Sequence, residues 1–387
     1  MKIEKIEVLR TSLRYKKNAF YRPTENGVIV KIHTSDGITG VGEVSPIPSY
    51  SGETQEGVSA MIEKYLAPGL IGLDPLNLEK IIGQMDRLAY YNFSAKTAID
   101  AALHDIAGKY CRLPVCTLLG GRVSEQIPVL YIIFPYFGAG RQRGDEIDPD
   151  SLEINAAQAF EAVEKYGIKH IKLKWWNYEK NRAFELERVK SVRKAVGDEV
   201  SLWVDINGGL TPTLAIQAAR ELEEYHVDFM EQPTPRWDFN GLELVTKSVG
   251  KRIGIIADDC IFSLGEALEV VRRQAADGLN VKPVKMGGLY RSRQMVAIAD
   301  AANLPCLVGR GHESSVGTLP GIHLSASSRT MKLPGELSHH LLLEDDLTVE
   351  PVHVKDGCIR VPEEPGLGFR LDEEKVKEAV KRARKTP

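Results

Sequence analysis

The strongest constraint on the fold of this chain is a repeated pattern, in which a short apolar run is followed by an amphipathic helical segment. Seven such runs recur after residue 127, about 30 residues apart: PVLYIIF, HIKLK, VSLWVDIN, VDFMEQP, IGIIADD, GLNVKPVK and LPCLVG. Strands that alternate with helices pair in parallel through right-handed crossovers. With a weaker eighth run near Leu341, the pattern predicts a (β/α)8 barrel. No glycine-rich dinucleotide fingerprint follows any of these strands, which counts against an open nucleotide-binding sheet.

The segments on either side of this pattern predict a second domain. Residues 1–50 are strand-rich, with hairpin turn chemistry at residues 35–37, and residues 53–110 change to a helical period. A sheet followed by helices is typical of an α+β domain. The tail from about Thr348 returns to strand and helix patterns, and we expect it to complete this domain.

Composition excludes several classes of partner. A chain of 387 residues with 43% hydrophobic and 27% charged residues is typical of a globular protein. The net charge of −3 gives no electrostatic basis for binding nucleic acid or an anionic membrane, and no apolar stretch is long enough to span a membrane. The opening MKIEKIEVLR lacks a signal-peptide core, and the five scattered cysteines show no CxxC spacing. We therefore expect a cytoplasmic protein with free thiols and no zinc.

Three acidic residues end three successive apolar runs. Asp205, Glu231 and Asp258 are separated by one strand–helix unit each, so a barrel would place them at the same level. Any one of them alone could be a helix cap or a solvated loop acid. Three carboxylates together in a partly buried cleft would repel one another, and a divalent cation removes that repulsion. Hard oxygen ligands favour Mg²⁺, with Mn²⁺ as the alternative.

Lysines end the neighbouring strands. In HIKLK, Lys172 and Lys174 alternate with Ile171 and Leu173, and Lys282 follows the sixth run on the opposite side of the predicted barrel. A solvated face would explain the alternation by itself. If the lysines instead face the barrel interior, the aliphatic side chains pack outward against the helices. Together with the acids, this arrangement predicts an active site.

The residue types predict proton abstraction next to a carboxylate. A metal-bound carboxylate substrate becomes acidic at its α-carbon, because the metal stabilises the enediolate. The charge of Lys172 should lower the pKa of Lys174, so that Lys174 can act as the base. Lys282 would then return or remove a proton on the other face. Lys285 lies three residues further along and is expected to face elsewhere.

This set of residues resembles the enolase superfamily, and within it the mandelate racemase/muconate lactonizing enzyme family, muconate lactonizing subgroup. The stretches ALHDIAGKYCRLPVCTLLGG (102–121), GVGEVSP (40–46) and NVKPVKMGG support the resemblance. It implies an enolase-like α/β fold: a modified TIM barrel, (β/α)7β, at residues 127–347, with an α+β capping domain built from residues 1–126 and 348–387. It also implies that Asp205, Glu231 and Asp258 bind the metal, with Lys174 and Lys282 as the acid/base pair and Lys172 as their helper.

The resemblance implies a Mg²⁺-dependent isomerase, muconate cycloisomerase-like, that acts on a small carboxylate. Racemisation or epimerisation of amino-acid derivatives, dehydration of a β-hydroxy acid, and a barrel without catalysis remain alternatives. LPCLVG ends without the histidine used by the mandelate racemase and sugar-acid dehydratase subgroups, and His312 is expected either to have a structural role or to support the residues that contact the substrate. Glu336, followed by Leu337, is more like cycloisomerases than the Asp-x-Asp of dipeptide epimerases. Glu313 is a second candidate pocket acid, and self-association as a homo-oligomer is expected.

Substrate contacts are expected from loops above the barrel. Residues 12–27 carry Arg14, Arg22 and Tyr21, and are interpreted either as a solvated basic loop or as a lid that offers a cation to a second anionic group. Asn207, in the VDIN motif, is a further candidate for substrate binding. Residues 46–53 and 134–149 are candidate pocket walls.

Overall fold

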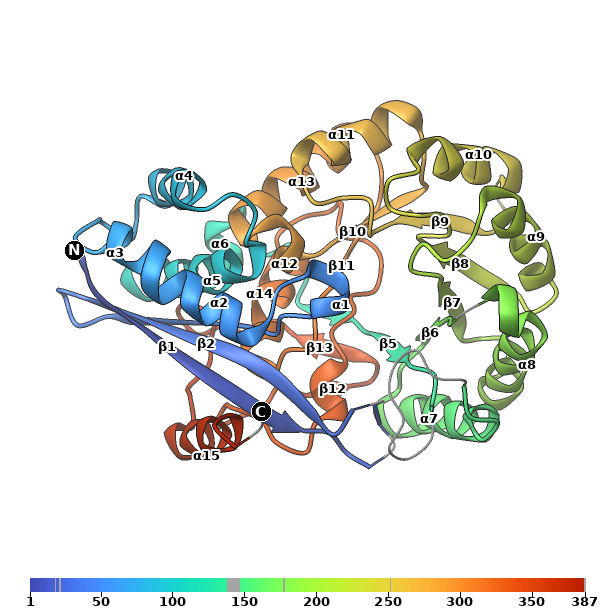
Figure 1. Ribbon diagram of the computed structural model, residues 1–387, viewed down its shortest axis with the longest axis horizontal. Coiled ribbons are helices and arrows are strands. Elements are labelled where there is room, and N and C mark those ends of the chain that lie inside the picture. Colours follow the sequence, from blue (N-terminus) through green and yellow to red (C-terminus); the bar gives the residue numbers. More distant parts are fainter. Residues whose placement is uncertain (18, 21, 138–146, 177, 251, 386–387) are drawn as a thin grey trace.

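The computed structural model describes residues 1–17, 19–20, 22–137, 147–176, 178–250 and 252–385. Figure 1 shows two parts, a curved sheet surrounded by helices and a second sheet covered by its own helices. None of the described helices is long and apolar enough to cross a membrane.

The larger part is a parallel seven-stranded sheet that curls into an incomplete barrel, which confirms the predicted α/β fold. Its order is β11-β10-β9-β8-β7-β6-β5, so each strand pairs with its neighbour along the chain. The strands are β5 (Leu130–Ile133), β6 (His170–Lys174), β7 (Ser201–Asp205), β8 (Val227–Glu231), β9 (Gly254–Ala257), β10 (Gly278–Val281) and β11 (Cys306–Val308). The main helices between and after them are α7 (Ser151–Tyr166), α8 (Tyr178–Val196), α9 (Pro212–Glu223), α10 (Phe239–Val249), α11 (Leu264–Arg273), α13 (Leu289–Ala301) and α14 (Ser315–Ala326).

The eighth apolar run, near Leu341, does not form the strand that the sequence pattern predicts. Residues 339–342 around Leu341 form a 3-10 helix, η2 (His339–Leu342). The ring is closed a few residues earlier, where Gly335 accepts a hydrogen bond from the Leu130 amide (2.7 Å) and the Glu336 amide donates to Val308 (2.9 Å). The short segment around Glu336 therefore joins β5 to β11 and points a carboxylate toward the barrel axis.

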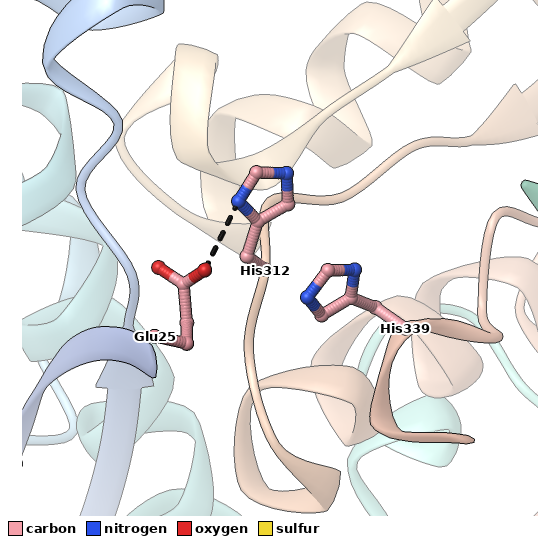
Figure 2. A group of neighbouring side chains, drawn as sticks. All are labelled: Glu25, His312 and His339. Carbon is pink, nitrogen blue, oxygen red and sulfur yellow. Dashed lines mark ion pairs between the residues drawn. The ribbon is translucent and has the colours of Figure 1, made fainter. Parts of the chain in front are cut away.

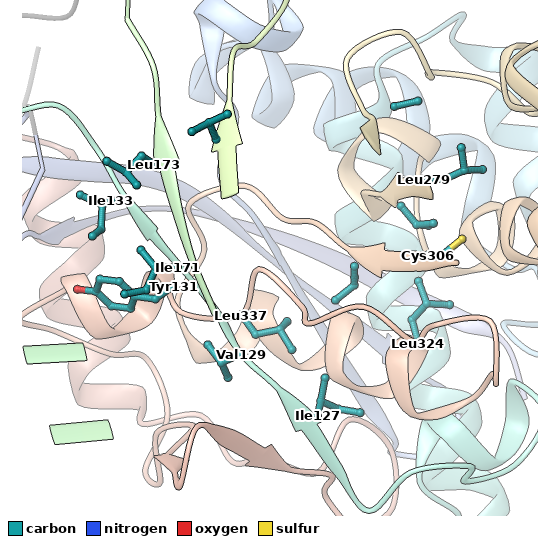
Figure 3. Close-up of a cluster of buried hydrophobic side chains, with 14 of the residues drawn as sticks. Ile127, Val129, Tyr131, Ile133, Ile171, Leu173, Leu279, Cys306, Leu324 and Leu337 are labelled. Atoms are coloured by element: carbon teal, nitrogen blue, oxygen red, sulfur yellow. The ribbon is translucent and has the colours of Figure 1, made fainter. Parts of the chain in front are cut away.

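On β6 the lysines point toward the barrel interior and the aliphatic side chains point outward, as the alternation predicted. Ile171 and Leu173 are fully buried in the large core between the sheet and its helices, beside Tyr131 and Ile133 of β5 (Figure 3). The inward positions of the lower barrel carry Leu130, Trp203, Ile256 and Leu307, which form a small separate apolar cluster. This cluster supports the polar layer above it.

The capping part begins with an antiparallel sheet of β1 (Ile3–Arg14), β2 (Thr24–Thr34) and β3 (Thr39–Val44). Helix α5 (Phe93–Cys111) lies directly on β3, because Gly40 and Gly42 have no side chain. A Cβ atom at either glycine would lie 2.1 Å from a carbonyl oxygen of α5. The remaining helices are α1 (Pro48–Ser51), α2 (Gln55–Met61), the π-helix η1 (Ile62–Leu66), α3 (Ala67–Leu70), α4 (Leu78–Leu88) and α6 (Val115–Leu118).

The C-terminal tail returns to both parts of the molecule. Helix α15 (Glu373–Ala383) packs on β1, and Arg382 donates a hydrogen bond to the Ser12 carbonyl (2.7 Å). Strands β12 (Val354–Lys355) and β13 (Cys358–Arg360) form a small sheet with β4 (Gln126–Pro128) just before the barrel. The domain limits at residues 126 and 347 stay predictions.

A buried carboxylate joins the capping sheet to the barrel. Glu43 of β3 accepts hydrogen bonds from the amides of Ser314 (3.2 Å) and Gly317 (2.7 Å) and from the Ser314 hydroxyl (2.6 Å). These donors lie at the N-terminus of α14, where the helix dipole favours a negative charge. Burial nevertheless raises the pKa of Glu43 to about 7.

Replacing Glu43 with glutamine is expected to flatten the dependence of stability on pH. With its pKa raised, folded Glu43 keeps a proton that the unfolded chain releases between about pH 4.5 and 7, so its contribution to stability falls as pH rises through this window. Over that range the free energy of unfolding of the wild type should fall by about 3 kcal/mol relative to that of the variant. Urea denaturation of both proteins at pH 5 and pH 8 measures the difference, and parallel losses would contradict it.

Candidate active site

The three predicted carboxylates converge at the carboxyl ends of neighbouring strands. Asp205 pairs in register with Glu231, and Asp258 directly follows β9. All three side chains are completely buried, and one oxygen from each lies within 4.8 Å of the others. The group therefore has the donor chemistry and spacing to hold a hard divalent cation.

Four lysines balance the charge of this group. Lys172 Nζ lies 2.7 Å from Glu231 and also contacts Glu336, Lys174 contacts Asp205, and Lys282 and Lys285 contact Asp258. Burial raises the pKa of Glu231 to about 7, in spite of Lys172. Burial also acts to raise the pKa of Asp205, but Lys174 and Lys172 outweigh it and hold that pKa below its ordinary value.

Lys172 lies beneath the site rather than on its wall. Its side chain is fully buried between Glu231 and Glu336, and burial lowers its pKa against the attraction of Glu231. Asn280 donates to Glu231 (2.9 Å) and to Glu336 (3.2 Å). Glu336, predicted as a substrate contact, also accepts a hydrogen bond from the Arg310 amide (3.4 Å), so both of its carboxylate oxygens already have partners within the protein.

Replacing Lys172 with methionine is expected to cost about 3–5 kcal/mol of stability, because Glu231 and Glu336 would be left as buried carboxylates without their cation. Urea denaturation measures the loss. Replacing Lys172 and Glu336 together with methionine should recover part of it. If the single variant is as stable as the wild type, the ion pair contributes nothing.

Lys174 and Lys282 face the cavity from β6 and β10, two strands that are separated by three others in the sheet. Lys174 ends β6, and 17% of its side chain is exposed, whereas Lys282 follows β10 and is buried. Both line the cavity above the carboxylates. Burial would lower the pKa of Lys282, but Asp258 and Glu231 raise it above its ordinary value.

Lys285 also enters the site, and the expectation that it faces elsewhere is wrong. A short helix, α12 (Pro283–Met286), begins immediately after Lys282, so the chain turns back over β10. Lys285 Nζ then lies 2.6 Å from Asp258 Oδ1. The prediction assumed that the strand continued, and the helical turn returns the third residue to the same side.

A cavity of about 1190 Å³ lies between this charged layer and the capping domain. Its walls are rich in aromatic side chains: Tyr50, Tyr91 and Phe93 from the capping domain and Phe134, Phe137, Trp175, Trp176, Trp237, Phe239 and Phe262 from the barrel. Asn207 also lines it and donates to Asp259 (3.2 Å), and its role in substrate binding stays a prediction. Tyr50 lies over Lys282, and burial followed by the charge of Asp258 raises the pKa of its phenol, which stays neutral.

A second group of metal-ligating side chain types borders the cavity. Figure 2 shows Glu25 of the capping sheet beside His312 and His339, whose rings stack 4.5 Å apart. Arg22 donates to Glu25 (2.5 Å) and to His312 Nδ1 (3.1 Å), and the Tyr15 hydroxyl lies 2.7 Å from His339 Nε2. The Arg22 guanidinium thus supplies the positive charge within this group. A metal cation would have to displace it, so we interpret the group as a hydrogen-bonded wall.

Comparison with known families agrees with this geometry. Residues 16–120 match the mandelate racemase/muconate lactonizing enzyme N-terminal domain, and residues 155–375 match the enolase C-terminal domain-like family. The chain belongs to the mandelate racemase/muconate lactonizing enzyme family. It is therefore an enolase-superfamily enzyme, a metal-dependent isomerase, as the sequence motifs predicted.

Relatives within the family catalyse different overall reactions. The chain is 34% identical to a chloromuconate cycloisomerase of Delftia acidovorans, over 92% of both chains, and 31% identical to an L-Ala-D/L-Glu epimerase of Clostridium acetobutylicum, over 89% and 90%. Among solved structures, an N-succinyl Arg/Lys racemase of Bacillus cereus matches with a TM-score of 0.87, 29% identity and 98% coverage of both chains. A muconate lactonizing enzyme of Pseudomonas putida matches equally well, at 30% identity with 98% and 99% coverage.

Three predicted substrate contacts, Arg14, Arg22 and Glu313, do not line the cavity themselves, although Arg22 belongs to the hydrogen-bonded wall that borders it. Arg14 is more than half exposed and pairs with Asp345 (3.1 Å) and Glu344 (3.3 Å), which draw it away. Arg22 is held by Glu25, and Tyr21 lies outside the described residues. Glu313 is buried beside Arg310 (3.4 Å), behind the cavity wall.

Two histidines that line the cavity were not predicted from the sequence to do so. His312 was expected to have a structural or supporting role but lines the cavity, and His339 was not singled out. The pair His339-His340, close behind Glu336, was the available signal, because a polar pair next to a predicted strand end lies near the site.

Proposed function

We propose that this protein transfers a proton at the carbon next to a substrate carboxylate and that its overall reaction is a muconate-type cycloisomerisation. In that reaction a carboxylate oxygen adds to the diene, and the enediolate that results is protonated at its α-carbon; the reverse reaction removes this proton. One observation supports the first part: Lys174 and Lys282 approach one cavity from different strands, directly above three buried carboxylates. A bound Mg²⁺ or Mn²⁺, held by Asp205, Glu231 and Asp258, would supply positive charge that stabilises the enediolate.

The side chains divide the remaining work. Lys174, which is more exposed than Lys282, is the proposed proton carrier at the α-carbon: it delivers the proton to the enediolate when the lactone forms and removes it as the base in the reverse direction. Lys282 is its acid/base partner on the other side of the cavity. Lys172 keeps Glu231 and Glu336 in place from below. The aromatic walls exclude water around the reacting atoms, which strengthens each of these electrostatic interactions.

Glu336 supports cycloisomerisation over dipeptide epimerisation. An epimerase of dipeptides needs an acid for the substrate ammonium group, but Glu336 is occupied by Lys172 and Asn280. Racemisation of an acylated amino acid remains the second candidate, because two lysines on different walls can serve as base and acid in turn. A β-hydroxy-acid dehydratase would use the same residues.

Turnover in D₂O tests the proposal. With Mg²⁺ present, muconate should be lost from the ultraviolet spectrum, and deuterium should enter next to the carboxylate of the lactone product. N-acyl amino acids, dipeptides and β-hydroxy acids, followed by polarimetry and NMR, distinguish the alternative reactions. No exchange and no turnover with any of these acids would contradict the proposed chemistry and favour a barrel without catalysis.

A further inference from the structure

Hydrogen bonds fix both the side chain and the backbone of Asp258. Lys285 Nζ lies 2.6 Å from Asp258 Oδ1 and 2.5 Å from the Asp258 carbonyl oxygen, while Lys282 contacts Oδ2. Behind it, the Gln232 side-chain oxygen accepts hydrogen bonds from the amides of Asp258 (3.0 Å) and Cys260 (3.2 Å). The carboxylate plane and the backbone that carries it are therefore fixed together.

Lys285 is itself rigidly placed. Only 1% of the residue is exposed, and its ammonium lies 5.7 Å from the centre of the Phe262 ring, so its positive charge meets Asp258 on one side and an aromatic ring on the other. The short helix that carries it is anchored to the capping domain, because Thr97 donates to the Pro283 carbonyl (3.0 Å). A buried lysine with these contacts holds one geometry rather than sampling the cavity.

We propose that Lys285 is a positioning residue, which clamps Asp258 so that it offers a single oxygen to the divalent cation, and that this clamp sets the affinity for the cation. The inference rests on the proposed function, since it takes Asp258 as a metal ligand. With Oδ1 occupied by Lys285, only Oδ2 is left for the cation. Lys282, which contacts Oδ2 in this structure, is then the lysine that faces the substrate.

The clamp is expected to act on binding more than on chemistry. Side chains that orient a metal ligand typically change metal affinity 10- to 100-fold when they are removed. Lys285→Met deletes the ammonium but keeps most of the aliphatic volume next to Phe262. A carboxylate without this partner can rotate or pair fully with Lys282, and both changes compete with the cation.

Titration of the full chain with Mn²⁺ after chelator treatment tests the clamp, with free Mn²⁺ measured by electron paramagnetic resonance. Lys285→Met should raise the Mn²⁺ dissociation constant about 10- to 100-fold. At saturating Mn²⁺ it should regain most of the wild-type kcat, which a residue that transfers protons would not. Lys285→Arg keeps the charge and the donors, and should bind Mn²⁺ more tightly than the methionine variant.

Lys96→Met is the matched control. Lys96 is another buried lysine that pairs with a carboxylate, Asp86 (2.8 Å), and in the described part of the chain no ion pair joins it to Asp205, Glu231 or Asp258. Its replacement should leave Mn²⁺ affinity within twofold of wild type. If Lys285→Met also stays within twofold, or if Lys285→Arg binds no better than it, the clamp is overturned although the proposed reaction stands. If the wild type itself binds no Mn²⁺, both fail together.

Discussion

Alanine at Lys174 or Lys282 is expected to lower kcat/KM by about 10²–10⁴-fold, the range for a general acid or base. Neither replacement should unfold the chain. Lys174 is partly exposed, and loss of Lys282 still leaves Asp258 paired with Lys285. Steady-state kinetics with the identified substrate, together with circular dichroism spectra of each variant, check both parts of this expectation.

The two variants also separate the candidate reactions. In a racemase that uses one lysine for each enantiomer, each variant should still exchange the α-proton of one enantiomer with D₂O, because one lysine remains. In a cycloisomerase a single proton is delivered to the α-carbon, so only the lysine that delivers it should be needed for exchange of the α-proton of the lactone with D₂O. Lys190→Ala is a suitable control, since Lys190 is exposed and pairs only with Glu187 among the described residues. Full activity in either Lys174→Ala or Lys282→Ala would remove that lysine from the mechanism.

The residues that the sequence located correctly all lie at or next to a strand. A side chain on a strand has its direction set by a period of two, and its height in the barrel is set by the strand end. Lys172, Lys174, Asp205 and Glu231 lie on strands, and Asp258 is the first residue after the end of β9. Their convergence could therefore be predicted from the hydrophobic pattern and the spacing alone.

The errors lie where the chain leaves the strands, or where the end of a strand meets a segment far away in the sequence. Lys285 returns to the site because a helix begins at Pro283, and the closing segment at Gly335 has no regular strand that a pattern could show. Arg14 is drawn to Asp345, which is 331 residues away in the sequence. Such contacts depend on which loops meet in space, and a local pattern carries no information about that.

Removal of the divalent cation is expected to abolish turnover and to lower thermal stability. The acids that the cation would join are fully buried, so bulk water screens their mutual repulsion poorly. A cation present at 100 times its dissociation constant stabilises the folded chain by about 2.7 kcal/mol. For a chain of 387 residues that corresponds to a melting temperature about 3 °C higher with Mg²⁺ than after chelation.

The three carboxylates also predict which substitutions should remove the effect of Mg²⁺ and of a chelator on melting temperature and turnover. Asp205→Asn combined with Glu231→Gln removes two charges from the set of three, so added Mg²⁺ should no longer shift the melting temperature or restore turnover. In the wild type, Mg²⁺ and Mn²⁺ should both restore activity to the stripped enzyme, since both accept carboxylate oxygens in octahedral geometry. Differential scanning calorimetry and kinetics on protein with verified metal content measure both effects. Full turnover by metal-free protein would show that the four lysines alone balance the negative charges of the substrate and of the acids. The metal would then have no part in the reaction.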